Sequence, residues 1–284
     1  MRPQKTRPSA RAGSNRTTPL IRCVIFDLDD TLYDNFRQRV RVAHRSAAKA
    51  MVEAGLKASV EAVYRARLRA FRDDPMLRHI DAEVCSRFAA DDPVRISHAA
   101  REAYFHCPVG KLTLFSGTIP LLDHLDRHGV RSFVVSFGEP RIQRAKIKSL
   151  GLEGHPLISS ILYADRDKQL TKEAAFRQIQ RGLGLPADEI LVVGDRPMSE
   201  IRAGNELGMH TVRIHRGEFA VQEPQGPDEE PDYVVKSISE IRRLAYLWGD
   251  RRRAHRERQG SAEKASSQGA NRRQKARTKQ VRRH

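Results

Sequence analysis

The chain has 284 residues, enough for one large domain with an insertion, and its formal net charge is +17 at pH 7. No apolar run approaches the roughly 20 residues of a membrane-spanning helix, and the first residues hold no apolar segment typical of signal peptides. The three cysteines have no CxxC spacing and the eleven histidines form no HExxH pattern, which argues against disulfides and a zinc site. We therefore expect a reducing, cytoplasmic setting.

The excess basic charge lies at the two ends of the chain. Residues 1–22 carry a net charge of +6 and residues 250–284 a net charge of +10, whereas residues 23–249 carry only +1. Both ends are poor in apolar residues, so we predict disordered basic tails at 1–19 and 249–284. Such tails favour nonspecific contact with nucleic acid or another polyanion, although solvated tails that keep the protein soluble explain them equally well.

The first predicted element is a buried strand over 23–26 that ends in a cluster of acids. Asp27, Asp29 and Asp30 follow it within four residues, and Thr31 comes next. In open α/β sheets, ligands bind at the carboxyl ends of the strands. Carboxylates crowded there repel one another and need a counter-charge, for which Mg²⁺ is the natural candidate. The alternative is a helix N-cap with an acidic first turn, which does not need three aspartates.

Residues 36–110 contain helical spacing and no convincing strand. One apolar face runs from Val40 to Ala54 and a second from Val60 to Phe71, and further helices are expected near 80–90 and 93–106. A helical insertion placed directly after the acidic loop is typical of a cap that covers a site. A separate helical subdomain without a catalytic role is the alternative.

From residue 111 onward, short apolar runs alternate with helical faces. The runs are 131–135, 158–162, 190–193, 211–214 and 233–235. The helical faces comprise Ile119, Leu122 and Leu125, and then Phe176, Ile179 and Leu183. This alternation predicts an α/β fold with a doubly wound, Rossmann-like parallel sheet. Its core is expected to comprise residues 20–35 and 111–248, with the helical cap at 36–110.

Two later strands also end in polar residues. The hydroxyl of Ser136, before Phe137-Gly138, is suited to hold a phosphate oxygen, although Ser-Phe-Gly is also an ordinary turn. Gly194 permits a sharp turn before Asp195, which supplies a second metal carboxylate, and Glu200 follows five residues later. The alternative for Asp195 is a helix cap.

Together these motifs resemble the haloacid dehalogenase-like superfamily over roughly residues 21–245. The family's four signatures are matched by Asp27-Leu28-Asp29-Asp30-Thr31, by Ser136, by Lys172 or alternatively Lys168, and by Gly194-Asp195 with Glu200. Glu200 stands where the family more commonly has an aspartate.

The resemblance implies that Asp27 is a nucleophile that forms an aspartyl-phosphate and that Asp29 is the general acid and base. We expect the crowding of neighbouring acids to keep Asp29 protonated for its first task. The resemblance also implies Mg²⁺ bound by Asp27, the main-chain carbonyl of Asp29, and Asp195. Ser136 and Lys172 would then bind the remaining phosphate oxygens.

The supporting residues in this scheme are Thr31, Gly194 and Glu200, with the Thr31 hydroxyl securing the loop. Dehalogenases and transport ATPases of this superfamily lack the second aspartate, whereas Asp29 is present here. The resemblance therefore implies a Mg²⁺-dependent phosphatase for a small phosphorylated metabolite. The alternatives are a phosphomutase, and a nucleic-acid-associated or scaffolding protein that uses its basic tails.

Overall fold

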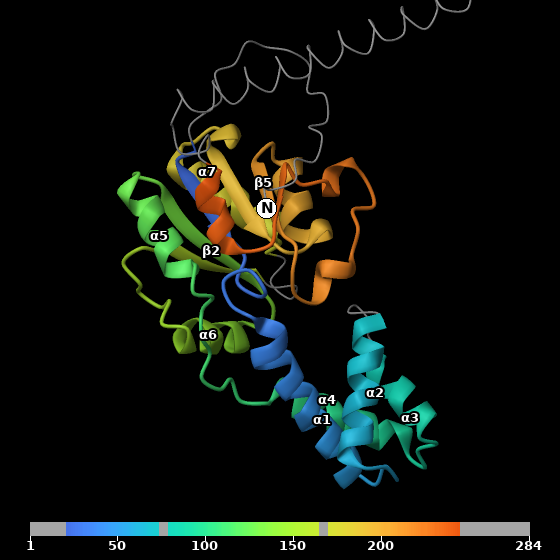
Figure 1. The fold of residues 1–284 in the computed structure, drawn as a ribbon. Coiled ribbons are helices and arrows are strands. Elements are labelled where there is room, and N and C mark those ends of the chain that lie inside the picture. The colour runs from blue at the N-terminus through green and yellow to red at the C-terminus, as the bar shows by residue number, and fades with distance from the viewer. Residues whose placement is uncertain (1–20, 74–78, 165–169, 245–284) are drawn as a thin grey trace, which may run out of the picture.

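A six-stranded parallel sheet forms the centre of the computed structural model, which describes residues 21–73, 79–164 and 170–244 (Figure 1). Across the sheet, the strands are β3 (Ser160–Ala164), β2 (Arg131–Phe137), β1 (Cys23–Phe26), β4 (Ile190–Gly194), β5 (His210–Ile214) and β6 (Tyr233–Val235). Every neighbouring pair is parallel, which confirms the predicted α/β sheet. The strand expected at 158–162 begins and ends two residues later.

The predicted tails, 1–19 and 249–284, lie outside the described residues, as does Lys168. The predicted role of these segments therefore stays a prediction.

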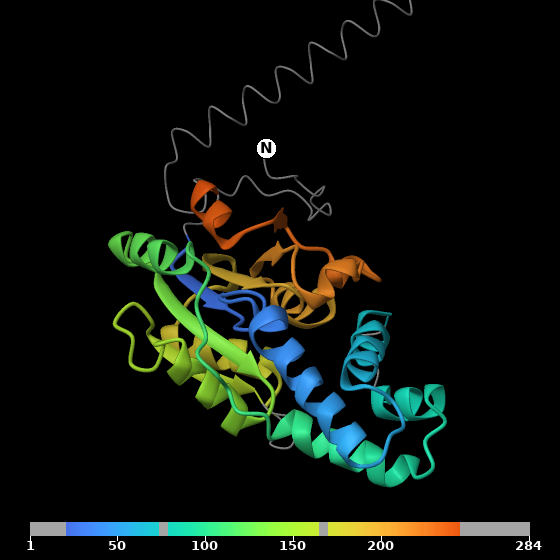
Figure 2. The same cartoon turned by 60° about the horizontal axis from the view of Figure 1, so that its bottom comes forward.

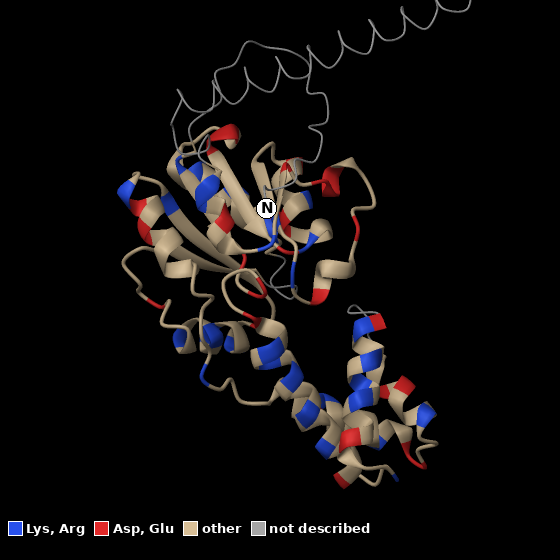
Figure 3. Cartoon of the chain, viewed as in Figure 1, with Lys and Arg blue, Asp and Glu red and all other residues tan. Residues whose placement is uncertain are grey.

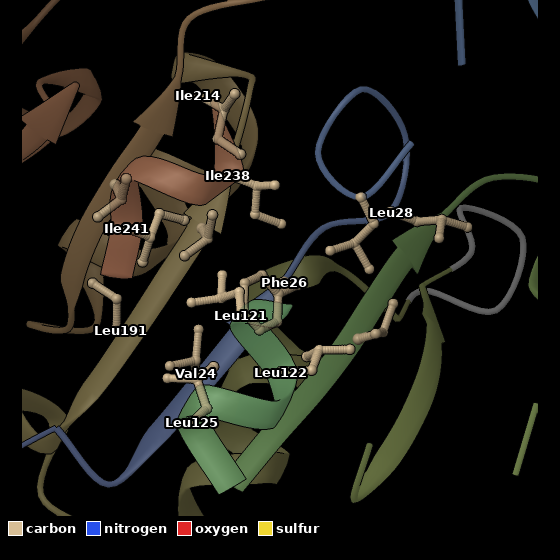
Figure 4. Packing of buried hydrophobic residues seen from close by; sticks show 14 of the residues in the cluster. Val24, Phe26, Leu28, Leu121, Leu122, Leu125, Leu191, Ile214, Ile238 and Ile241 are labelled. Carbon is tan, nitrogen blue, oxygen red and sulfur yellow. The ribbon is translucent and has the colours of Figure 1, made fainter. Parts of the chain in front are cut away.

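Helices cover both faces of the sheet, and the side chains of β1 alternate between the two faces. Val24 and Phe26 belong to a cluster with helix α5, whereas Cys23 and Ile25 belong to a cluster with helix α7. Figure 4 shows the first cluster, in which the side chains of α5 lie against β1. All four β1 residues are fully buried, which explains why the strand is an uninterrupted apolar run.

The helices that flank the sheet follow the strands along the chain. They are α5 (Thr118–Arg127), α6 (Pro140–Ser149), α7 (Lys172–Leu183) and α8 (Arg202–Glu206), and the shorter turns are η2 (Ala187–Glu189), η3 (Pro197–Ile201), η4 (Glu218–Val221), η5 (Pro227–Glu229) and η6 (Ile238–Arg243). The predicted face of α5 is wrong in one position. Ile119 is 38% exposed, whereas Leu121 is buried beside Leu122 and Leu125, so the buried stripe of the helix centres on these three leucines and leaves Ile119 at its edge.

Between β1 and β2 the chain forms a group of helices with its own apolar core. After the short turn η1 (Phe36–Val40) come α1 (Arg41–Glu53), α2 (Val60–Asp73), α3 (Ile80–Arg87) and α4 (Pro93–Phe105). We refer to the described residues from 36 to 110 as the helical insertion. Figures 1 and 2 show it beside the sheet, at the end where β1 finishes. The role of the helical insertion as a cap over the site stays a prediction.

Both the helical insertion and the part of the chain around the sheet carry basic and acidic residues (Figure 3), and the net charge of residues 23–249 is close to zero. Within that part, no helix is both long enough and apolar enough to cross a membrane.

Candidate active site

Three predicted site residues meet because their strands are neighbours. β1 lies between β2 and β4, with Phe26 in register with Val134 and Val193. Asp27 directly follows β1, Asp195 directly follows β4, and Ser136 lies near the end of β2. Parallel strands end at the same edge of a sheet, so these three side chains are brought to one place. All three are buried.

Lys172 reaches this place from the first turn of α7. Its Nζ donates hydrogen bonds to Asp27 Oδ1 and to Glu200 Oε1. The ammonium group is buried, which disfavours its charge, but the two carboxylates outweigh burial and raise the pKa of Lys172. The lysine is therefore a charged group held against the predicted nucleophile.

Glu200 is the second carboxylate that pairs with Lys172. Its Oε2 accepts from the backbone N–H of Arg196 at 3.2 Å, and its Oε1 accepts from the Ser199 hydroxyl at 2.9 Å. Burial opposes its ionisation, yet Lys172 foremost holds the pKa of Glu200 below its ordinary value. A Cβ at Gly194 would lie 2.6 Å from Glu200 Cβ, so only glycine lets the acid pack over this turn.

The predicted nucleophile has a perturbed carboxyl group. Burial raises the pKa of Asp27 to about 7, although Lys172 favours its ionised form. The negative charges of Glu200 and Asp29 add to the rise. A strongly perturbed carboxyl at the end of a buried strand is typical of a catalytic position.

Asp195 has two buried carboxylate oxygens, neither of which has a hydrogen-bond partner in the described structure. It caps no helix, since the cap position of η3 is Arg196. Burial first, and then Glu200 and Asp27, raise the pKa of Asp195 well above its ordinary value. A pair of orphaned oxygens facing other acids fits a hard divalent cation.

The described residues contain no group of three His, Cys, Asp or Glu side chains placed closely enough to bind a metal by themselves. A cation bound at Asp195 would therefore need further oxygen ligands, such as a main-chain carbonyl, water and phosphate. Mg²⁺ commonly binds to proteins in this way, through one or two carboxylates.

Ser136 has a buried hydroxyl that makes no hydrogen bond within the described structure. The chain leaves β2 through Gly138, whose φ of 144° lies in a region that favours glycine. A buried, unpaired hydroxyl beside Asp27 fits the predicted contact with a phosphate oxygen.

Asp29 is held on both of its oxygens. Tyr33 donates its hydroxyl to Oδ1 at 2.7 Å, and Lys146 Nζ lies 3.0 Å from Oδ1 and 2.7 Å from Oδ2. Gln143 Nε2 is a longer contact, 3.4 Å from Oδ2. Burial raises the pKa of Asp29, but Lys146 and these hydrogen bonds outweigh it and bring the pKa below the ordinary value. The expectation that crowding by acids keeps Asp29 protonated is therefore wrong.

Asp30 shapes the acidic loop. Its φ of 54° is left-handed, and its carboxylate accepts from the backbone N–H groups of Phe36 at 3.2 Å and Glu218 at 3.5 Å. The Thr31 hydroxyl is buried without a hydrogen-bond partner in the described structure, so the expectation that it secures the loop is wrong. The N-cap alternative also fails, because the next helical turn has Asn35 at its cap position.

Sequence reasoning missed Lys146, Gln143 and Tyr33 as parts of this site. Gln143 and Lys146 are buried polar residues three positions apart on α6, on the same side as buried Ile147. The sequence did offer a signal for them: polar residues lie on the buried face of the helix that directly follows β2, and buried polar residues point to a site.

The fold and these side chains define a class of hydrolase. A sequence model of the haloacid dehalogenase-like hydrolases matches residues 21–208, and the chain belongs to this family.

Relatives with curated names include the glyceraldehyde 3-phosphate phosphatases of Methanopyrus kandleri and Methanocaldococcus jannaschii. Each is 31% identical over 226 residues, which covers 78% of this chain and 96% of the relative. A phosphoserine phosphatase from Thermus thermophilus is 25% identical over 251 residues, covering 78% of this chain and 98% of that protein. The predicted class, a phosphatase of this family, is confirmed.

Among solved structures, a magnesium-bound hydrolase of this superfamily from Bacillus subtilis aligns with a TM-score of 0.54 at 20% identity. The alignment covers 79% of this chain and 98% of that one. At this level of identity the likeness shows the fold alone.

Proposed function

We propose that this chain is a Mg²⁺-dependent phosphatase that hydrolyses a small phosphorylated metabolite through a phosphate ester of Asp27. The observation that carries the proposal is the meeting of Asp27, Asp195 and Lys172 at one sheet edge. It supplies a nucleophile, orphaned oxygens for a cation, and a buried positive charge for phosphate oxygens.

In the first step, an oxygen of Asp27 attacks phosphorus and the bond to the leaving alcohol breaks. Lys172 and the Ser136 hydroxyl stabilise the charge that develops on the other phosphoryl oxygens. Asp29 passes a proton to the departing alcohol oxygen. Because Lys146 keeps Asp29 ionised in the free protein, that proton arrives on the phosphate monoanion of the substrate and moves to Asp29 after binding.

In the second step, water attacks the phosphorus of the Asp27 phosphate. Asp29 accepts a proton from this water, and the bond between phosphorus and the Asp27 oxygen breaks. Inorganic phosphate leaves and Asp27 is restored. Because its lowered pKa keeps Asp29 ionised, the carboxylate is free to accept this proton.

The residues proposed to hold Mg²⁺ are Asp27, Asp195 and the main-chain carbonyl of Asp29. When bound, the cation neutralises charge on the phosphate and on the carboxylates around it. The unpaired oxygens of Asp195 support this assignment.

The names of the relatives point to three-carbon phosphate esters as the first candidates. Glyceraldehyde 3-phosphate and phosphoserine share a phosphate on a primary alcohol, and relatives of this chain carry the names of phosphatases for both. We propose an ester of this class as the substrate.

The cysteines support the proposed cytoplasmic setting. Cys23, Cys85 and Cys107 are free and buried. Burial raises the pKa of the Cys23 thiol to about 12, which keeps it unreactive.

A Mg²⁺-dependent screen of phosphorylated metabolites tests the proposed function, with D27N as the blank. Replacing the attacking carboxylate by an amide of the same shape should lower kcat by at least about 10³-fold while leaving the circular dichroism spectrum unchanged. The measurement is inorganic phosphate released from glyceraldehyde 3-phosphate, phosphoserine and 4-nitrophenyl phosphate.

Undiminished turnover by D27N would exclude the covalent scheme. An isomeric phosphate ester formed in place of inorganic phosphate would instead identify a phosphomutase. The nucleic-acid or scaffolding alternative rests on the predicted tails, and no contact among the described residues favours it.

A further inference from the structure

Lys146, which is itself buried, makes an ion pair with half-buried Asp29, the predicted proton carrier. It lies on α6, 117 residues along the chain from Asp29, and only 6% of its side chain is exposed. Its Nζ is within hydrogen-bond distance of both carboxylate oxygens, at 2.7 and 3.0 Å. A lysine loses hydration and side-chain freedom when it is buried in this way. Such a pair is weak evidence for stability, so a functional reason has to be sought.

Hydrogen bonds at the N-terminal end of α6 fix the position of the helix that carries Lys146. Glu139 caps the helix by accepting from the backbone N–H groups of Arg141 and Ile142, at 3.0 and 2.9 Å. One turn before Lys146, Gln143 Nε2 donates to the carbonyl of Phe137 at 2.8 Å. The helix is therefore fastened to the end of β2, the strand that carries Ser136. Lys146 links the position of Asp29 to the predicted phosphate-binding strand.

Lys146 and Lys172 have separate partners. Lys172 donates to Asp27 and Glu200, whereas Lys146 donates to both carboxylate oxygens of Asp29. One positive charge thus lies beside the predicted nucleophile and another beside the predicted acid and base. The Lys172 ammonium is already placed for phosphate oxygens, which leaves Lys146 to act on the Asp29 carboxylate.

We infer that Lys146 is a positioning residue, which holds the Asp29 carboxylate in the orientation that delivers a proton to the leaving alcohol. The inference rests on the proposed phosphatase function. In the step concerned, the phosphorus–oxygen bond to the alcohol breaks, its electron pair stays on the alcohol oxygen, and the Asp29 proton moves to that oxygen. Without Lys146, one oxygen of Asp29 keeps its Tyr33 contact, but the carboxylate can rotate away from the leaving group.

The value of a positioned proton donor depends on the leaving group. An alkoxide is strongly basic and needs a proton as it departs, whereas 4-nitrophenolate is weakly basic and departs without one. The ratio kcat/KM reports the steps up to the departure of the leaving group and excludes the later hydrolysis of the Asp27 phosphate. Comparing kcat/KM for an alkyl and an aryl ester therefore isolates the step in which Lys146 is proposed to act.

The experiment compares K146M with the wild type on 4-nitrophenyl phosphate and on phosphoserine or glyceraldehyde 3-phosphate, whichever alkyl ester the wild type hydrolyses faster. We expect K146M to lower kcat/KM about 10- to 100-fold for the alkyl ester and less than about 3-fold for the aryl ester. K148M removes an exposed lysine from the same helix and should change neither value. In a D29N background, K146M should lower kcat/KM for the alkyl ester no further.

Equal losses on both esters, or no loss, would overturn the inference while leaving the phosphatase function in place. Absence of turnover by the wild type would instead overturn the proposed function. A measurement independent of activity is urea unfolding, in which the midpoints of D29N, K146M and the double variant are each compared with that of the wild type. The two single shifts should be non-additive, and additive shifts would show that the two side chains are not coupled.

Discussion

Asp27, Asp29 and Asp195 lie near the ends of two neighbouring strands, Asp27 and Asp195 buried and Asp29 half-buried, yet their surroundings give them different properties. Asp29 faces Lys146 and has a lowered pKa, whereas Asp195 has no hydrogen-bond partner among the described residues and has a raised pKa. Asp27 lies between these extremes because Lys172 partly offsets its burial. Environment rather than residue type therefore separates the proposed nucleophile, proton carrier and metal ligand.

Replacing Asp195 by asparagine should stabilise the metal-free protein. Folding raises the pKa of Asp195, so its ionisation is harder in the folded state than in the unfolded state. The Asp195 carboxyl therefore destabilises the folded protein as the pH rises above the unfolded pKa of about 4. Asn keeps the shape and removes the charge, so in EDTA at pH 7.5 we expect the free energy of unfolding to rise by about 1–3 kcal/mol. Urea unfolding measures this change.

The same variant should lose the stabilisation that Mg²⁺ gives the wild type. A ligand that binds only the folded state raises Tm with its concentration, and this rise should disappear when Asp195 is neutral. D91N, which removes an exposed acid of the helical insertion, should keep the full Mg²⁺ response. A Mg²⁺-dependent rise in the Tm of D195N equal to that of the wild type would place the cation elsewhere.

At the scale of elements, α7 carries Lys172 at its first position. The Thr171 hydroxyl caps this helix by accepting from the backbone N–H of Ala174 at 3.1 Å. Gly184, with a φ of 61°, ends it in a left-handed conformation. The cap therefore fixes the turn from which the ammonium group reaches Asp27.

T171A should lower the free energy of unfolding by about 1 kcal/mol, since an unpaired backbone N–H is left at the start of α7. Activity should also fall, because fraying of this turn displaces Lys172. T171S keeps the hydroxyl and should retain both stability and activity, as measured by urea unfolding and phosphate release. Equal stability of T171A and T171S would contradict a role for the cap.

The helical insertion is tied together where it meets the core. Buried Arg39 donates to the carbonyls of Tyr104 and Cys107, at 3.3 and 3.1 Å, and so joins the start of the insertion to its end. Burial, with the charge of Glu218 next, raises the pKa of Tyr104 to about 12, and Asp29 contributes to the rise. The hydroxyl of Tyr104 therefore responds to charges of the core, while the role of the helical insertion as a cap stays a prediction.

At the scale of the whole molecule, the sequence could predict what local patterns or the family signatures carry, including Lys172, which lies 145 residues from Asp27. Buried parallel strands are apolar runs, so all six strands were found, together with the acids that follow β1 and β4. The pairing of Lys146 with Asp29 joins residues 117 positions apart, and no local pattern reveals such a pair. The expected role of Thr31 in securing the loop was wrong for a similar reason: the loop is held partly by the backbone N–H of Glu218, which is distant in sequence.

The distribution of charge over the chain separates the site from the basic ends. Residues 23–249 are nearly neutral, while residues 1–22 and 250–284 together carry almost all of the net charge. Long-range attraction to a polyanion is therefore expected from the ends, and the proposed chemistry from the rest.

Removing residues 1–19 and 250–284 should separate these two properties. The shortened protein keeps every residue of the proposed site, so kcat/KM for a small phosphate ester should stay within about twofold of the full chain. Its elution from a heparin column should move to a much lower salt concentration, because most of the groups that displace counterions are gone. A large fall in kcat/KM would show that the ends contribute to the site. Unchanged elution would assign the polyanion contact to the nearly neutral body, where lysine and arginine side chains such as those of the helical insertion would have to make it.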